Sequence, residues 1–525
     1  MNRDCILGEV MDTRRFDFCV VGGGATGLGV ALDAASRGHS VVLVEQADFA
    51  KGTSSRSTKL VHGGVRYLKQ GNLALVRDAL RERGRMRSNA PGLVRDLNFV
   101  IPIYRRSDQV LYGAGMKFYD LLSGRLSFGK SLLLNREETL RRIPTVRKAG
   151  LMGGVLYHDG QFDDSRLAVA LARTAASRGA KVLNYVRCVE FIREEGKVRG
   201  ILALDTETGR SFPIHAKCVI NATGVFVDEL RAKEEAGASP MVSVSQGIHF
   251  VLPKRFLPGR DAIMIPKTDD GRVLFALPWH DRVVLGTTDT PVQAASLEPR
   301  ALGEEVSFLM AHAEKYLTEA PKPSDVLSVF AGLRPLVKAG GTATTASLSR
   351  DHTIVVSGGG LLTVTGGKWT TYRKMAEDVV DRGEAVGGLA GKQCNTADLV
   401  LLDGSHGGMP AAPEQAVDDQ HLSLSGERIR RFVHEEMART VEDVLARRSR
   451  WLLLDAVGSM AGAERVARLM AEELGKGAQW ITDQIADYRR VAAGYCGSTY
   501  FGSCVEHQPG GISVPGNPQK NERMD

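Results

Sequence analysis

The residues best suited to do chemistry in this chain lie near its beginning. Residues 53–68, TSSRSTKLVHGGVRYL, combine three serines and two threonines with a histidine and two arginines, and they include the glycine pair Gly63–Gly64. Small hydroxyl side chains suit hydrogen bonds to a polar ligand, and paired glycines let the backbone come close to something flat. We therefore interpret this segment as a loop that wraps around a cofactor.

A glycine-rich turn precedes this loop. Gly22, Gly24 and Gly27 have the spacing G-x-G-x-x-G, and they lie between the apolar segment 16–21 and an alanine-rich helical pattern. The first glycine permits a tight bend, the second lets the backbone approach a pyrophosphate, and the third lets helix and strand pack closely. Because a helix N-terminus also favours phosphate, the turn predicts dinucleotide binding.

The segments that follow favour FAD over NAD. Glu45 ends a second apolar strand, where a carboxylate accepts hydrogen bonds from an adenosine ribose and would repel the 2′-phosphate of NADP. Two later segments, 219–226 and 359–380, each place a glycine turn after a strand, so the chain visits its nucleotide three times. Such repeated contact indicates an extended cofactor. The later cofactor-binding candidates are Ala222, Thr223, Gly224, Gly366, Gly367, Lys368 and Thr370.

Hydrophobic periodicity predicts the elements that must position these residues. Helical patterns lie near 72–88, 109–122, 163–178 and 369–383. Strand-like runs lie at 181–186, 199–204, 217–221, 248–252, 273–277, 283–286 and 353–357. Strands alternate with helices at first and dominate later, which predicts an α/β fold in which a Rossmann-type domain is interleaved with a mainly antiparallel domain. A helical C-terminal domain follows.

Composition narrows the class of protein. The 525 residues are 43% apolar and 25% charged, as in globular proteins of two or three domains, and they include no run of about twenty apolar residues. The N-terminus lacks the apolar core of a secretory signal. A net charge of +7 could serve an anionic partner or be a slightly basic surface. Seven scattered cysteines without a C-x-x-C pair argue against a zinc site and a disulfide framework and fit a reducing compartment.

Seven motifs in a fixed order carry a resemblance to a known family. They are VVGGGATGLG, TSSRSTKLVHGGVRYL, INATG, GTTD, GLRPL, SRDHTI and GGKWTTYRK. Together they resemble the FAD-dependent glycerol-3-phosphate dehydrogenases, relatives of the D-amino-acid-oxidase-type flavoproteins. The resemblance covers roughly residues 14–500. It implies FAD as the cofactor, with four hydroxyl residues lying along it: Thr53, Ser54, Ser55 and Ser57.

The resemblance also implies a division into domains. The FAD-binding domain is expected at 15–80, 163–245 and 335–385, and the substrate domain at 81–162 and 246–334. Composition and periodicity predict a linker at 386–425, a C-terminal helical domain at 426–502 and a disordered tail at 503–525, and the linker and the tail depart from the family. No calcium-binding loop of EF-hand spacing follows the helical region, unlike the animal mitochondrial form.

The activity implied is oxidation of sn-glycerol 3-phosphate to dihydroxyacetone phosphate, with hydride transfer to FAD and electron transfer to a membrane quinone. Three alternatives stay open. The acceptor could be O2, which would make the protein an oxidase that releases hydrogen peroxide. The substrate could be another small hydroxy or amino acid. The protein could be an FAD-dependent RNA-binding or RNA-modifying protein, although no basic tract with stacking aromatics stands out.

The implied chemistry needs cations for a substrate phosphate. The substrate-binding candidates are Arg66, Tyr67, Arg272, Arg334 and Arg350. Arg334 and Arg350 occupy family motif positions and are the first choice for the phosphate. Lys368 lies in a glycine turn at a helix start, which suits it to the reduced flavin or the substrate.

A general base must take the proton of the C2 hydroxyl. His62, beside the glycine pair, and His249, in QGIHFVL, compete for this role, and His62 is preferred. The half of the loop that begins at His62 is expected at the reactive edge of the flavin.

A lipid-dissolved quinone requires contact with a membrane. A helix over 72–88 would place Arg77, Arg81 and Arg85 on one face, where they could meet anionic headgroups. We expect a cytoplasmic protein, peripherally bound to the inner face of the cell membrane. The expected partners are sn-glycerol 3-phosphate, a quinone, the lipid surface and, in a homodimer, a second copy of the chain, but no nucleic acid.

Overall fold

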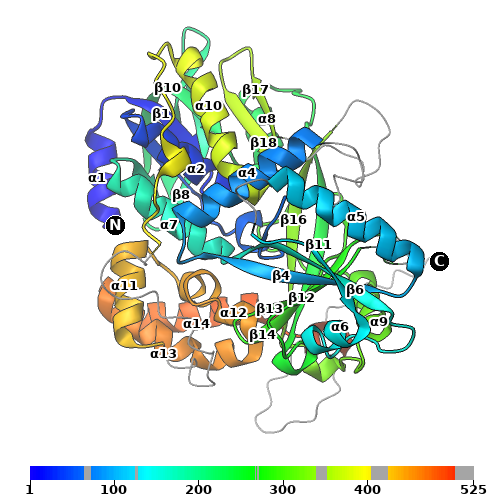
Figure 1. The fold of residues 1–525 in the computed structure, drawn as a ribbon. Helices are drawn as coiled ribbons and strands as arrows, with labels where there is room; N and C mark the ends of the chain where they lie inside the picture. The colour runs from blue at the N-terminus through cyan, green and yellow to red at the C-terminus, as the bar shows by residue number, and fades with distance from the viewer. Residues whose placement is uncertain are drawn as a thin grey trace, which may run out of the picture.

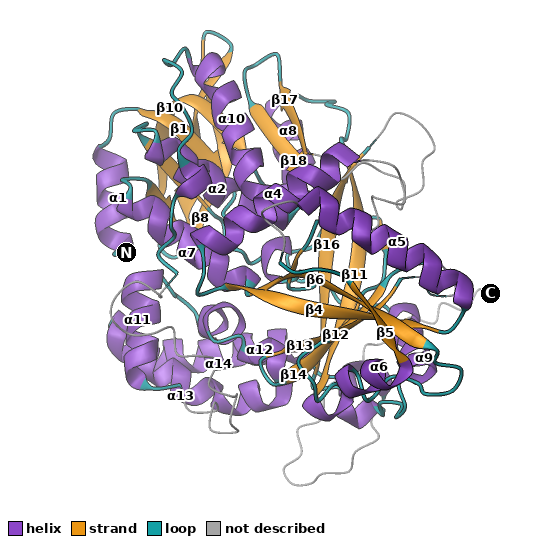
Figure 2. Cartoon of the chain, viewed as in Figure 1, coloured by secondary structure: helices purple, strands orange, loops and turns teal. Residues whose placement is uncertain are grey.

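The computed structural model describes residues 1–63, 73–123, 128–266, 268, 271–338, 352–403 and 424–502. Two large sheets and their covering helices form the fold, and a helical C-terminal region lies beside both (Figure 1). Figure 2 shows helices grouped around the first sheet, long strands in the second and a C-terminal part that is all helix. This arrangement confirms the predicted α/β class with a helical C-terminal domain.

The first sheet has a parallel core. Its main strands run in the order β17-β18-β10-β1-β2-β7. Their bounds are β1 Phe16–Val21, β2 Val41–Val44, β7 Lys181–Leu183, β10 Ser211–Asn221, β17 His352–Val356 and β18 Leu362–Gly366. β1 pairs in parallel with both β2 and β10, and β10 with β18. β8 (Val186–Glu194) and β9 (Lys197–Asp205) extend β10 by antiparallel pairing.

Three helices pack together against this sheet. They are α2 Ala25–Ser36, α7 Asp164–Ser177 and α10 Tyr372–Gly387, and α2 contacts the other two. The contact between α2 and α10 is close, because a Cβ at Gly29 would lie 2.9 Å from the ring of Tyr372. The predicted strand–helix–strand unit at the start of the chain is confirmed. A further helix, α1 (Arg3–Asp12), lies against β7 and β10.

The second sheet is mainly antiparallel. Its long path is β15-β11-β14-β13-β12-β4-β6-β3, with β16 on β11 and β5 on β6. The strands are β3 Leu60–Val61, β4 Val94–Ile103, β5 Leu132–Asn135, β6 Gly153–Phe162, β11 Val242–Pro253, β12 Ala262–Ile265, β13 Leu274–Trp279, β14 Arg282–Gly286, β15 Thr290–Val292 and β16 Ser328–Val337. The helices inserted along it are α4 Leu73–Asn89, α5 Arg106–Ser123, α6 Arg136–Arg142 and α9 Gly303–Tyr316.

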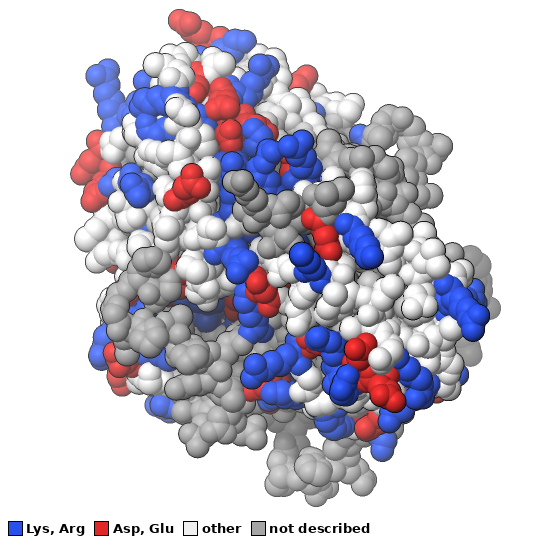
Figure 3. All heavy atoms as spheres, viewed as in Figure 1, with Lys and Arg blue, Asp and Glu red and all other residues white. Residues whose placement is uncertain are grey.

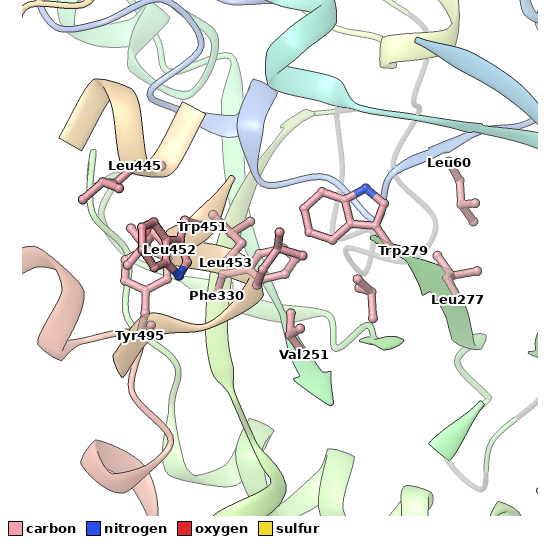
Figure 4. Close-up of a cluster of buried hydrophobic side chains, with 14 of the residues drawn as sticks. Leu60, Val251, Leu277, Trp279, Phe330, Leu445, Trp451, Leu452, Leu453 and Tyr495 are labelled. Atoms are coloured by element: carbon pink, nitrogen blue, oxygen red, sulfur yellow. The ribbon is translucent and has the colours of Figure 1, made fainter. Parts of the chain in front are cut away.

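The C-terminal helices begin at residue 426. They are α11 Gly426–Glu436, a π-helical turn Asp443–Arg448, α12 Trp451–Leu454, α13 Ala456–Leu474, α14 Ala478–Ala493 and α15 Ser498–Phe501. Their apolar core is continuous with that of the second sheet. In Figure 4 the labelled Phe330 of β16 lies between Trp279 and the Trp451–Leu453 segment, so these helices are docked by apolar packing.

The predicted helices and strands lie where the periodicity places them. The helices near 72–88, 109–122, 163–178 and 369–383 correspond to α4, α5, α7 and α10, and each predicted strand falls on an observed one. The predicted domain boundaries remain predictions, and residues 404–423 and 503–525 lie outside the described residues. Within the described part of the chain, we find no helix both long enough and apolar enough to cross a membrane.

Candidate functional site

A cavity of about 450 Å³ lies at the carboxyl ends of β1, β2, β10 and β18. This is the edge of a parallel sheet where nucleotides bind. The three glycine turns lie among the distant parts of the chain that line it, as their repetition predicts. The lining residues among the predicted cofactor contacts are Gly22, Gly24, Glu45, Thr53, Ser54, Ala222, Thr223, Gly224, Gly366, Gly367 and Lys368.

The first glycine turn is tight enough to exclude side chains. Gly22 has a φ of +112°, and a Cβ there would lie 2.6 Å from the carbonyl oxygen of Ala222. A Cβ at Gly27 would lie 1.9 Å from the carbonyl oxygen of Gly22, which is the close helix–strand approach expected of the third glycine. At Gly24 a Cβ would meet only the hydroxyl of Ser54, at 3.1 Å. The first turn of α2 thus faces the cavity at close range, which fits a pyrophosphate.

Glu45 closes the turn from the side. Its carboxylate accepts the N–H of Gly23 at 2.6 Å and that of Ala47 at 2.9 Å. Burial raises the pKa of this carboxyl, and the two backbone hydrogen bonds oppose the rise. Because a carboxylate can accept further hydrogen bonds, Glu45 can still receive the hydroxyls of a ribose.

Only part of the hydroxyl-rich loop lines the cavity. The Thr53 hydroxyl donates to the carbonyl of Leu333 on β16 at 2.7 Å, and that of Ser54 accepts the N–H of Ala25 at 2.9 Å. These contacts tie the loop to both the second sheet and the start of α2. The loop therefore joins the two halves of the fold at the cofactor cavity.

The structure places Ser55 and Ser57 away from the cavity, contrary to the expectation that they lie along the cofactor. The backbone N–H and hydroxyl of Ser57 both donate to Asp164, at 3.0 and 2.7 Å. The carbonyl of Ser55 accepts from the ammonium of Lys59 at 2.8 Å. Burial lowers the pKa of Lys59 to about 8, although Asp164 raises it. These residues form a buried polar network behind the loop.

The late glycine turn docks directly on the early loop. The indole N–H of Trp369 donates to the carbonyl of Ser54 at 2.9 Å, and the Thr370 hydroxyl accepts the backbone N–H of His62 at 3.3 Å. Trp369 and Lys368 line the cavity, whereas Thr370 does not line it and contacts His62 instead. Trp369 was not predicted as a site residue, because a tryptophan beside a glycine turn is equally typical of an ordinary core.

The two candidate histidines differ in their surroundings. His249 is buried and its Nε2 lies 2.9 Å from the Thr58 hydroxyl, while its ring stacks on Phe330. Burial lowers the pKa of His249 well below its usual value, and the positive charges of Lys59 and Arg334 lower it further. A protonated His249 is therefore disfavoured. His62 is half-buried, and its backbone N–H donates to Thr370, which follows the cavity-lining Trp369.

Arg334 is the candidate arginine that the structure places near the cavity wall, which Lys368 itself lines. It lies on β16 next to the cavity-lining Pro335, and its guanidinium donates to Thr287 at 3.1 Å and lies 3.3 Å from Asp289. Arg272 instead covers the ring of Phe308 on α9 at 5.0 Å, away from the cavity lining. Arg66, Tyr67 and Arg350 lie outside the described residues.

The predicted basic stripe on α4 carries less free charge than expected. Arg81 lies 3.7 Å from Asp78, and Arg85 donates to Glu82 at 2.6 Å. Arg85 is only 32% exposed. Acidic neighbours one turn away therefore offset two of the three arginines, and Arg77 is exposed.

Comparisons with known proteins agree with this geometry. The family described as FAD dependent oxidoreductase matches residues 17–373, and the C-terminal domain of alpha-glycerophosphate oxidase matches residues 357–480. A mitochondrial glycerol-3-phosphate dehydrogenase of Arabidopsis thaliana is 41% identical over 475 residues, which cover 88% of this chain and 73% of the relative. The human mitochondrial enzyme is 36% identical over 528 residues, covering 90% and 72%.

A solved structure extends the similarity to the whole fold. Glycerol-3-phosphate dehydrogenase from Bacillus halodurans, complexed with FAD, superposes with a TM-score of 0.76 at 30% identity, covering 94% of this chain and 97% of the other. The cofactor is FAD, as the glycine turns predict. With most of its length matched in both sequence and structure, the chain belongs to the family of FAD-dependent glycerol-3-phosphate dehydrogenases.

Proposed function

We propose that this protein oxidises sn-glycerol 3-phosphate to dihydroxyacetone phosphate. The observation that carries the proposal is the 41% identity with a glycerol-3-phosphate dehydrogenase over 88% of the chain. The family match over residues 17–373 spans the segments that line the cavity up to Trp369. FAD, when bound, supplies a hydride acceptor for the carbon that is oxidised. Everything else in the reaction falls to the side chains around it.

Arg334 is the described residue best placed to receive the substrate phosphate. Its side chain is 24% exposed and projects from β16 beside the cavity wall, and contacts with Thr287 and Asp289 orient its guanidinium. A planar guanidinium held in this way suits the two-pronged recognition of a phosphate. Arg66 and Arg350 remain the further candidates for this role.

His62 is our choice for the base that takes the C2 hydroxyl proton. A base must gain a proton as the hydride leaves, and the surroundings of His249 oppose a positive charge. The backbone N–H of His62 donates to Thr370, which directly follows the cavity-lining Trp369, so His62 lies close to this wall. We therefore give His249, which lies 2.9 Å from the Thr58 hydroxyl, a supporting role and not that of the base.

We further propose that electrons leave to a membrane quinone from a peripherally bound enzyme on the inner face of the cell membrane. The support is an apolar surface formed by α5 and β5, which contact each other. Its exposed side chains are Val110 (75%), Leu111 (58%), Leu132 (53%), Leu133 (51%) and Phe118 (42%). Exposed basic residues border it at positions 105, 106, 117, 130 and 136. Figure 3 shows uncharged surface near the right-hand part of α5, with basic side chains toward its edges.

This α5–β5 face suits a lipid surface better than the α4 stripe does. Clustered exposed apolar side chains mark interaction sites, and cations at their rim attract anionic headgroups. On α4, by contrast, acidic partners offset Arg81 and Arg85. The homodimer stays a proposal without further support.

The test of the substrate is an absorption spectrum. Adding sn-glycerol 3-phosphate to the purified FAD-bound protein without oxygen should bleach the flavin bands, while glycerol should leave them nearly unchanged. Unchanged bands with glycerol 3-phosphate would refute the substrate assignment. Subsequent reoxidation by a quinone in anionic vesicles, faster than by oxygen, supports the dehydrogenase. Stoichiometric peroxide release that ignores vesicles would make the protein an oxidase.

A further inference from the structure

One wall of the FAD cavity is a short segment that contacts the cavity on one side and the C-terminal helices on the other. Residues 50–54 all line the cavity, and Ala50 is fixed to the glycine turn by its N–H, which donates to the carbonyl of Gly23 at 2.9 Å. The other side of this segment meets the C-terminal helices, which are about 390 residues later in the chain. Contacts with the C-terminal helices therefore affect the conformation of the residues that line the cavity.

Charged side chains from the π-helical turn and its neighbours hold that outer face. Glu442 pairs with Lys51 at 2.6 Å. Arg447 pairs with Asp48 at 2.5 Å, and Arg448 contacts the same carboxylate. These contacts fix Asp48 and Lys51, the latter of which lines the cavity itself. Although burial raises the pKa of Glu442, Arg447 and Lys51 lower it to about 2, so this carboxylate is charged near neutral pH.

Arg450 continues the same line of contacts. Its guanidinium donates to the carbonyl of Ser55 at 3.2 Å and to Asp164 at 2.8 Å, and its side chain is only 2% exposed. Ser55 follows directly on the cavity-lining Ser54. The C-terminal helices thus contact the segment at Asp48, Lys51 and Ser55, before, within and after the cavity-lining residues 50–54.

Docking alone does not require these charges. Apolar packing already joins the C-terminal helices to the second sheet through Phe330 and the Trp451–Leu453 segment (Figure 4). Buried ion pairs add little net stability compared with apolar side chains of the same volume, because desolvation offsets their attraction. They do fix the direction of the groups they join. Because these ion pairs lie directly behind the cavity wall, we expect them to fix the conformation of the residues that form it.

We infer that the C-terminal helices position the 48–55 segment for FAD, and that Glu442, Arg447, Arg448 and Arg450 are the positioning residues. FAD affinity and docking of this turn are then coupled, so that each strengthens the other. The inference depends on FAD binding and not on the substrate or the electron acceptor. Its failure would leave the proposed reaction untouched.

The test compares two glutamates of the C-terminal region. Glu442→Gln weakens the pair with Lys51 at the cavity wall. Glu436→Gln weakens the pair with Arg166 on α7, at 2.5 and 2.8 Å, which also crosses to the first half of the chain but does not line the cavity. Arg448 donates to the backbone carbonyl of Glu436, which this substitution keeps, and its guanidinium lies 4.0 Å from the Glu436 carboxylate. Each apoprotein is titrated with FAD by fluorescence, and its melting temperature is measured separately.

We expect Glu442→Gln to weaken FAD binding by about fivefold to fiftyfold, the usual range of coupling between sites. Glu436→Gln should change FAD affinity by less than about twofold while lowering the melting temperature at least as much, since Glu436 is the more buried of the two. In a Lys51→Met background, Glu442→Gln should cause a smaller further loss, because it then acts only through Arg447, which Glu442 contacts at 2.7 Å. Equal FAD affinities in the two single variants would overturn the inference.

Hydrogen exchange supplies a readout that does not depend on activity. FAD should slow amide exchange over residues 443–450 in the native protein, and Glu442→Gln should reduce that protection. Arg450→Lys serves as a second variant, because it keeps the charge but loses the forked contact with Ser55 and Asp164. Exchange over 443–450 that ignores FAD, or native FAD affinity in Arg450→Lys, would also contradict the coupling.

Discussion

A methyl group at Gly27 should disable the FAD site. The Cβ of an alanine there would lie 1.9 Å from the carbonyl oxygen of Gly22, about 1.1 Å inside the 3.0 Å that such contacts tolerate. Neither partner is a flexible side chain, so α2 must move away from β1 or the Gly22 peptide must tilt. Gly22 has little room to tilt, because it already approaches the carbonyl of Ala222.

We expect Gly27→Ala to destabilise the protein by about 3 kcal/mol, the upper end for overpacking, since the clash is with backbone. At about 2–4 °C per kcal/mol, the melting temperature of the FAD-binding part should fall by roughly 6–12 °C. Differential scanning fluorimetry and the flavin content after purification measure the two effects.

Gly24→Ala is the matched control within the same turn. Its Cβ would meet only the Ser54 hydroxyl, at 3.1 Å, and that side chain can rotate. We expect about 1 kcal/mol of destabilisation or less, with any loss of FAD arising from the space the pyrophosphate needs. A Gly27→Ala protein that melts and retains FAD like Gly24→Ala would refute the argument from close approach.

Three further predictions concern the reaction. Arg334→Ala should raise KM for glycerol 3-phosphate about tenfold to hundredfold, as expected for a lost charge-assisted hydrogen bond of about 1.5–3 kcal/mol, with little effect on activity toward glycerol; equal losses on both would mean that the arginine supports the fold. His62→Ala should slow anaerobic flavin reduction by roughly 10²–10⁴ and His249→Ala by less, and the reverse order would reassign the base. Replacing Leu111 and Leu133 by glutamine should weaken binding to anionic vesicles and slow quinone reduction, and unchanged vesicle binding would remove the α5–β5 face from consideration.

Local patterns predicted the parts of the structure that local physics determines. The glycine turn could be predicted because two of its positions require glycine. Gly22 has a φ of +112°, and a Cβ at Gly27 would lie 1.9 Å from a carbonyl oxygen. The role of Glu45 could be predicted because it directly follows an apolar strand, at the sheet edge where a carboxylate meets a ribose. The later glycine turns could be assigned to the same cavity because a parallel sheet gathers the carboxyl ends of its strands at one edge.

Contacts made by tertiary structure could not be predicted in this way. Ser55 and Ser57 have the same residue type as Ser54, yet they serve Lys59 and Asp164, and only the register of the folded loop separates them. The pairing of basic and acidic residues on α4, and the exposure of apolar ones on α5, depend in the same way on which neighbours the fold supplies.

The three-part construction of the cavity has a consequence for how the protein matures in the cell. Its walls include residues from 21–54, 186–189, 222–233 and 364–375, so a nascent chain on the ribosome lacks a complete site until more than two thirds of it has been translated. Domains usually begin to fold in order as they emerge. Here the first strands and helix must wait for β18 and the Trp369 turn before FAD can be retained. Cofactor capture is then a late step in biogenesis, and flavin supply would govern the yield of finished protein rather than the rate of its synthesis.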